Sequence, residues 1–160
     1  MLWNNKDKAK PAEENAAQIR SIPLTEGVVW DLDTQPLIQF VSGANTEVYA
    51  SIEAHSNAHA ELEHYAFDLP NNLTPADAPK ARIATNIQEV WDLSEALTQE
   101  IASRQKDEGT GKTILVLINQ HENLLSNTEL ADNEFYQKTR ANLTEIIKEA
   151  EHHDINVLFA

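Results

Sequence analysis

The sequence predicts an α/β domain with a mainly parallel central sheet, and two observations lead to that prediction. From Ile19 onward, short apolar runs alternate with longer segments whose apolar residues recur at helical spacing. Two of the runs, LIQFV at 37–41 and ILVLI at 114–118, are almost entirely apolar, as strands must be when helices cover both faces of a sheet. We expect these two strands to lie in the centre of the sheet.

The chain is long enough for one domain with a buried core, because 41% of its 160 residues are hydrophobic. Residues 1–18 differ from the rest. They mix charged residues, Asn and Ala with almost no large apolar side chains, and this composition cannot offset the entropy lost on ordering. We therefore predict a flexible lead-in over 1–18 and a single domain over 19–160.

The strands are predicted from short runs of apolar and β-branched residues that end at turn residues. Six segments fit this pattern: 28–32, 37–41, 64–68, 82–85, 113–118 and 155–160. Segment 69–80, which follows the third of these strands and contains several prolines, is predicted to be a loop.

Three helices are predicted between the strands, over 46–63, 86–106 and 132–153. The second has the clearest start, because Asn86 can cap it and Glu89 follows three residues later. Its apolar stripe consists of Val90, Leu93, Leu97 and Ile101. The apolar residues of the third are Phe135, Leu143, Ile146, Ile147 and Ala150. Its last residues, His152 and His153, suit the negative end of a helix dipole.

Composition excludes several classes of function. The net charge of −14 argues against a nucleic-acid or anionic-lipid partner. The absence of cysteine excludes disulfides, thiolate metal sites and a cysteine nucleophile. No run of 18 apolar residues occurs, and the first 17 residues hold no apolar segment like that of a signal peptide. We expect a cytoplasmic segment without direct membrane contact.

The string GTGKT at 109–113 ends in Gly-Lys-Thr, as a phosphate-binding loop does. The full motif also needs a glycine where this chain has Lys106, and a strand before the loop and a helix after it. Here a predicted helix precedes the string and a strand follows it. A helix-to-strand turn in which Gly109 is left-handed accounts for the same residues.

Segment 42–50, SGANTEVYA, has the position that a phosphate loop requires, between a strand and the first helix. Its residues do not suit the chemistry. Tyr49 stands where the motif has lysine, Ala50 where it has a magnesium-binding hydroxyl, and Glu47 would repel a polyphosphate at the start of the helix. Nucleotide chemistry is therefore disfavoured at this loop.

Asn119 and Gln120 follow the strand at 113–118, where a nucleotide hydrolase would place an Asp to hold magnesium and a Glu to activate water. Amides preserve the size and hydrogen bonding of these groups. They cannot balance the charge of a metal or accept a proton from water. Two such losses at adjacent positions indicate a site that has lost its catalytic function.

His55 and His59 are four residues apart on the first predicted helix, a spacing that could hold zinc, and His64 follows at the next strand. The first two are predicted to project on the same side as Val48 and Ile52. Partly buried histidines at the edge of a packing face therefore account for them without a metal. A Ser-His-Asp triad cannot be identified from spacing alone.

The order of segments over 22–160 resembles the FtsK/SpoIIIE family of RecA-like P-loop ATPases, in particular the tandem ATPase domains of type VII secretion coupling proteins. Five segments occur in the family's order. They are the opening strand pair with the strand before the phosphate loop, the strand HYAFDLP, the helix WDLSEALTQEIASRQ, the Walker B strand ILVLINQHENLL, and the closing helix and strand EIIKEAEHHDINVLFA. The resemblance implies a RecA-like three-layer α/β/α domain.

The departures from the family lie where catalysis would occur. The resemblance places the family's Walker A motif on Gly43, Thr46, Val48, Tyr49 and Ala50, with Tyr49 and Ala50 replacing its Lys and Ser/Thr. Asn119 and Gln120 replace the Walker B Asp and Glu. Glu151, Asp154 and Asn156 stand where the family has Arg, Gly and His. No catalytic residue carries over, so no nucleotide or other cofactor is expected.

The resemblance implies a catalytically inactive ATPase-like domain that acts as a protein-interaction or regulatory module in a membrane-anchored coupling ATPase. Its expected partners are neighbouring ATPase domains of the same chain or complex and secreted protein substrates. The family continues into further sheet beyond the last strand, so the sequence is expected to be a fragment. Three alternatives stay open: a working ATPase that uses a neighbouring subunit's residues or residues 109–113, a DNA-translocase motor domain, and a stand-alone structural domain.

Overall fold

The structure is a computed structural model, and it describes residues 18–25, 27–39, 45–71, 73, 82–109 and 111–160. The elements of the main sheet are β3 (Leu37–Gln39), β4 (Leu62–Phe67), β5 (Arg82–Ala84), β6 (Thr113–Ile118) and β7 (Ile155–Phe159). The longer helices are α2 (Asn45–Ala58), α3 (Ile87–Gln105) and α5 (Glu134–Glu149). A hairpin of β1 (Ser21–Thr25) and β2 (Val28–Asp31), helix α4 (His121–Leu125) and the 3₁₀ helix η1 (Ala150–His153) complete the described elements.

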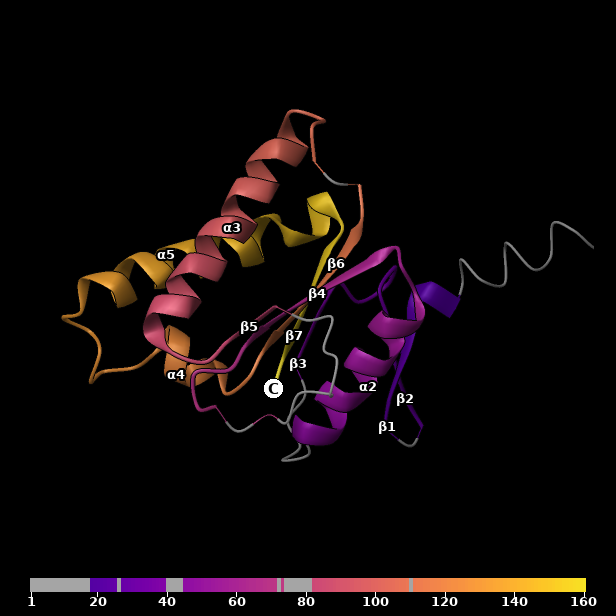
Figure 1. The fold of residues 1–160 in the computed structure, drawn as a ribbon, viewed down its shortest axis with the longest axis horizontal. Helices are drawn as coiled ribbons and strands as arrows, with labels where there is room; N and C mark the ends of the chain where they lie inside the picture. The colour runs from indigo at the N-terminus through magenta and orange to yellow at the C-terminus, as the bar shows by residue number, and fades with distance from the viewer. Residues whose placement is uncertain (1–17, 26, 40–44, 72, 74–81, 110) are drawn as a thin grey trace, which may run out of the picture.

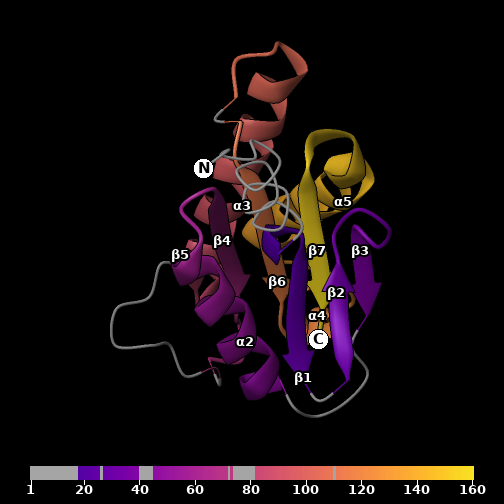
Figure 2. The same cartoon turned by 90° about the vertical axis from the view of Figure 1, so that its right-hand side faces the viewer.

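The central sheet has the strand order β3-β7-β6-β4-β5, and each of its pairings is parallel. Helices α3 and α5 cover one face, and α2 covers the other together with the antiparallel β1–β2 hairpin (Figures 1 and 2). This is the predicted three-layer α/β/α arrangement. None of the helices in the described part of the chain combines the length and the hydrophobicity that spanning a membrane requires.

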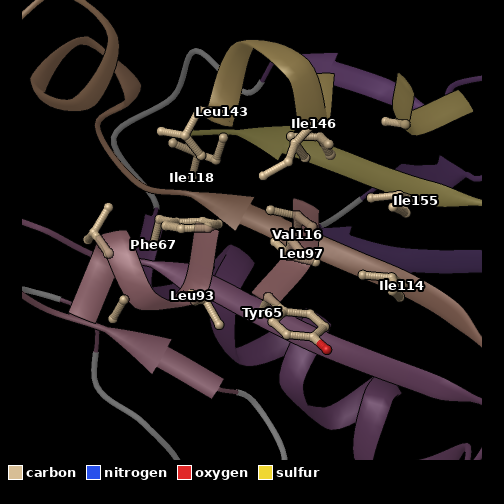
Figure 3. Close-up of a cluster of buried hydrophobic side chains, with 14 of the residues drawn as sticks. Tyr65, Phe67, Leu93, Leu97, Ile114, Val116, Ile118, Leu143, Ile146 and Ile155 are labelled. Carbon is tan, nitrogen blue, oxygen red and sulfur yellow. The ribbon is translucent and has the colours of Figure 1, made fainter. Parts of the chain in front are cut away.

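Two hydrophobic cores lie on opposite faces of the sheet, and β6 contributes to both. Figure 3 shows the core beneath α3 and α5, which contains Ile114, Val116 and Ile118. The intervening Leu115 and Leu117 belong to the core beneath α2 and the hairpin. Side chains of a strand alternate between its faces, so burial on both sides explains the continuous apolar run. The central position predicted for this strand is confirmed.

Helix α3 begins and ends through local hydrogen bonds. The side chain of Asn86 accepts a hydrogen bond from the Glu89 N–H at 2.9 Å, which confirms the predicted cap. At the other end, the Glu108 N–H donates to the Ser103 carbonyl and Asp107 is left-handed, with φ of 58°. This hydrogen bond and the left-handed residue form a Schellman motif, in which Asp107 takes the position usually held by glycine.

The position predicted for the strand LIQFV is wrong. Among the described residues, β3 lies at one edge of the sheet and pairs with β7 alone. Leu37 is 39% exposed, whereas Ile38 packs against the core beneath α2 and the hairpin. An apolar run indicates that both faces of a strand are covered by other parts of the protein, but it does not determine the order of strands in the sheet.

The first helix is shorter than predicted, because α2 ends at Ala58 and β4 already begins at Leu62. Phe135, one of the apolar residues of the third predicted helix, is 47% exposed. Tyr136 takes the buried position on α5 instead, and its hydroxyl accepts a hydrogen bond from the Asn127 N–H at 2.8 Å.

Two described elements, β1 and α4, were not predicted from the residue pattern. Strand β1 contains Pro23, which lacks the N–H that a ladder needs and so weakens a strand prediction. The family resemblance did imply a strand pair at this place. Helix α4 has only five residues, too few to show a helical period.

Candidate functional site

The carboxyl ends of β4, β6 and β7 meet at one edge of the sheet, where parallel α/β folds usually place their ligands. Backbone hydrogen bonds join the residues that follow these strands. The Asn119 N–H donates to the Phe67 carbonyl, and the Gln120 N–H donates to the Ala160 carbonyl, both at 2.9 Å. Parallel register therefore places Asp68 of one strand end beside Asn119 of the next.

Asp68 and Asn119 form the centre of this edge, and both are fully buried. The Asn119 amide donates a hydrogen bond to Asp68 Oδ1 at 2.9 Å. The other carboxylate oxygen, Oδ2, accepts from the Leu73 N–H at 3.1 Å. A hydrogen bond to a buried carboxylate is stronger than one between neutral groups. In this arrangement Asn119 supports a protein carboxylate rather than presenting a charge to a metal.

Tyr49 lies beneath this edge on α2, and its side chain is fully buried. Its ring centroid is 5.7 Å from that of His64 on β4. Burial, together with the nearby carboxylates of Glu53 and Asp68, raises the pKa of the Tyr49 phenol above its ordinary value. The phenol therefore stays neutral at physiological pH, and a neutral ring fills the position that the resemblance assigns to a phosphate-binding lysine.

Glu53 and His64 form a buried polar pair one turn further along α2. His64 Nδ1 lies 3.0 Å from Glu53 Oε2, and both side chains are nearly excluded from solvent. Sequence reasoning missed this pair. The available signal was an acidic residue four positions after Tyr49, on the side of the helix that faces the sheet.

Gln120 follows Asn119 with an uncommon backbone conformation, φ of 49° and ψ of 60°. Its side chain is exposed. The left-handed Gln120 turns the chain from β6 into α4. The first residue of α4 is His121, whose ring packs edge-on against Phe159, with ring centroids 5.6 Å apart. Gln120 thus lies at the carboxyl edge with an amide that cannot act as a general base.

The other residues that the resemblance assigns to Walker A are only partly visible. Gly43 lies outside the described residues, and for Thr46 only the helical backbone is described. Val48 is fully buried in the core beneath α2, and Ala50 is exposed.

The alternative string at 109–113 lies at the opposite, amino-terminal end of β6. It forms the helix-to-strand turn that the topology predicted. The residue identified as left-handed was wrong, since Asp107 and Gly111 have positive φ in this turn and Gly109 does not. Glycine is needed at 109 for another reason, because a Cβ there would clash with the side chain of Arg104.

The three histidines are not gathered into one site. His55 and His59 are partly buried on α2 with ring centroids 4.7 Å apart, and His55 Nε2 lies 2.9 Å from the Ile19 carbonyl oxygen. His64 is separately buried against Glu53. Among the described residues, no group of three or more His, Cys, Asp or Glu could hold a metal ion.

Comparison with known proteins yields no family model that matches the chain and no match among curated proteins. Among solved structures, the chain is similar to the pCW3 conjugation coupling protein TcpA in its monomer form with ATPγS. The two share 17% identity with a TM-score of 0.64, over 87% of this chain and 46% of that one. The chain thus spans less than half of TcpA, and this similarity identifies its fold as RecA-like.

Proposed function

We propose that this domain is a catalytically inactive, ATPase-like module of an FtsK/SpoIIIE-type coupling ATPase, and that it acts by binding proteins. The observation that carries the proposal is the closed hydrogen-bonded arrangement at the carboxyl edge. Asn119 uses its amide to hold the buried Asp68, and the neutral Tyr49 ring occupies the space beneath.

This arrangement opposes nucleotide chemistry in two ways. A phosphoryl group needs a cation to neutralise its charge, and Tyr49 supplies none. A magnesium ion needs acidic ligands and a hydrolytic water needs a base, but Asn119 and Gln120 supply amides. The domain keeps the fold of the ATPase while its polar edge is used for internal support.

The kind of coupling ATPase is a finer part of the proposal. The sequence resemblance favours the degenerate ATPase domains of type VII secretion, in which such a module would pack against neighbouring ATPase domains or secreted substrates. The solved neighbour is a conjugation coupling protein, and it supports the broader proposal of a coupling ATPase. A net charge of −14 argues against a DNA-translocase motor domain, which needs a positive surface to follow phosphates.

The proposal is tested by restoring the family's residues with Tyr49→Lys, Ala50→Thr, Asn119→Asp and Gln120→Glu in one variant. Circular dichroism first establishes that the variant is folded. We expect calorimetry to detect Mg-ATP binding by the variant but not by the parent chain. Binding by the unchanged parent would contradict the proposal. A folded variant that still fails to bind would contradict the alignment of Tyr49 and Asn119 with the Walker motifs.

A further inference from the structure

Two aromatic side chains from different helices meet at the surface where α3 and α5 begin. The ring centroids of Trp91 and Phe135 are 6.4 Å apart, with an edge-to-face angle of 62°. Phe135 is 47% exposed, and Trp91 is partly exposed. Paired, solvent-exposed aromatic rings are typical of the anchor points of protein interfaces.

The chain segments that carry this aromatic pair are acidic. Residues 86–95 and 119–137 contain seven carboxylates and no Lys or Arg. Figure 1 shows the starts of α3 and α5 together with α4 at one end of that helical layer. Glu95 is partly exposed. The other six carboxylates are exposed: Glu89, Asp92, Glu122, Glu129, Asp132 and Glu134.

Some of these carboxylates are engaged within the chain, and others are available to a partner. Glu89 accepts a hydrogen bond from the Thr85 N–H, and Glu134 is ion-paired with Lys138. The carboxylates of Glu122, Glu129 and Asp132 make no hydrogen bond or ion pair within the described part of the chain. Their charge is therefore directed to solvent on segments that adjoin the start of α5, which carries the exposed Phe135.

We infer that the Trp91–Phe135 surface binds a segment of a partner protein in which Lys or Arg side chains flank an apolar side chain. The apolar side chain would pack on Phe135, and a guanidinium or ammonium group could stack on the face of Trp91. The surrounding carboxylates would favour such a segment and repel acidic ones. The inference deepens the proposed function, since it names a surface and a partner chemistry for a module that binds proteins.

The probe is a synthetic amphipathic peptide of Lys and Leu, and a Glu/Leu peptide with the same apolar face serves as its control. Trp91 reports binding directly, because Trp30 is fully buried and Trp3 can be replaced in a Trp3→Phe background. We expect the Lys/Leu peptide to shift the Trp91 emission to shorter wavelength and to protect it from acrylamide. The Glu/Leu peptide should do neither, and added salt should weaken the binding.

Matched variants distinguish this surface from the general attraction of a basic peptide to an acidic protein. We expect Phe135→Ser and the triple variant Glu122→Gln, Glu129→Gln, Asp132→Asn each to weaken binding about tenfold. Two controls make the same kinds of change at other exposed positions. Val29→Ser removes an exposed apolar side chain, and the triple variant Glu47→Gln, Glu61→Gln, Glu145→Gln removes three exposed negative charges. Each control should weaken peptide binding less than about twofold.

Equal weakening by the matched variants, or an unchanged Trp91 signal, would overturn the inference. Such a result would leave the expected absence of nucleotide binding untouched, because that is tested by titration with ATP. Conversely, ATP binding by the parent chain would overturn that expectation and leave the peptide-binding surface in place.

Discussion

Replacing Asn119 with alanine should destabilise the domain strongly, because the amide holds a buried charge. The Asn119 amide donates to Asp68 Oδ1 at 2.9 Å, and both residues are fully buried. A hydrogen bond to a charged group contributes about 1.5–3 kcal/mol, and the small cavity adds to this. We therefore expect the free energy of unfolding to fall by about 2–4 kcal/mol.

The assay is urea unfolding at 25 °C followed by circular dichroism. With a slope of about 2 kcal/mol per molar urea, a loss of 3 kcal/mol lowers the midpoint by about 1.5 M. Gln120→Ala is the matched control, because it removes the neighbouring amide, which belongs to an exposed side chain. Glutamine and alanine have the same Cβ, so the left-handed backbone at position 120 disfavours both alike. This control should change the free energy of unfolding by no more than about 0.5 kcal/mol.

A double-mutant cycle with Asp68→Ala separates the hydrogen bond from the lost packing. The coupling energy between positions 68 and 119 should be at least about 1 kcal/mol. If Asn119→Ala lowers stability no more than the Gln120 control, or if Asn119→Ala and Asp68→Ala are additive, then Asn119 does not support the Asp68 carboxylate.

Three further predictions concern stability and are checked by unfolding midpoints. Leu97→Ala should cost about 2–5 kcal/mol, because Leu97 is fully buried between the sheet and α5; a smaller loss would contradict the packing of that core. Asp107→Gly should raise stability by about 0.5–1 kcal/mol by relieving the left-handed Schellman position, and a loss would contradict the assigned conformation. Burial lowers the pKa of His55, so the unfolded chain binds its proton more tightly and the stability due to neutral His55 declines as pH falls below about 6.5. His55→Gln should therefore reduce the drop in midpoint between about pH 7.5 and about pH 5.5, whereas His152→Gln should not.

The sequence predicted the elements whose burial leaves a periodic pattern. The boundaries of β6 agree with the prediction, and the Asn86 cap and the stripe of α3 are confirmed. The edge position of β3 could not be predicted, because an apolar run shows that a strand is covered but not which strands it pairs with. Phe135 shows a similar limit, since its neighbour Tyr136 is buried instead and accepts a hydrogen bond from Asn127 in the loop that precedes α5.

The candidate site was predictable in position but not in its interactions. Topology alone placed residues 119 and 120 at the carboxyl edge, because they follow a parallel strand. The hydrogen bond between Asn119 and Asp68 joins residues that are 51 positions apart, and only the strand register brings them together. The burial of Glu53 against His64 depends in the same way on how α2 lies against β4.

The backbone is left-handed at Asp154, a position that the sequence resemblance assigns to glycine. The resemblance places a glycine at this position, and φ there is 53°, a conformation that glycine adopts most easily. Aspartate is among the residues that tolerate this conformation, and its carboxylate also accepts a hydrogen bond from the Thr113 hydroxyl at 2.6 Å. The fold is therefore kept while the residue type differs.

We propose that this domain has a RecA-like fold and does not bind nucleotide. Calorimetric titration of the parent chain with Mg-ATP tests it most directly, with thermal unfolding alongside to register any stabilisation by ligand. We expect no heat of binding and no change in unfolding temperature up to about millimolar ATP. Binding with a dissociation constant of about 1 μM, equivalent to about −8 kcal/mol, would contradict it.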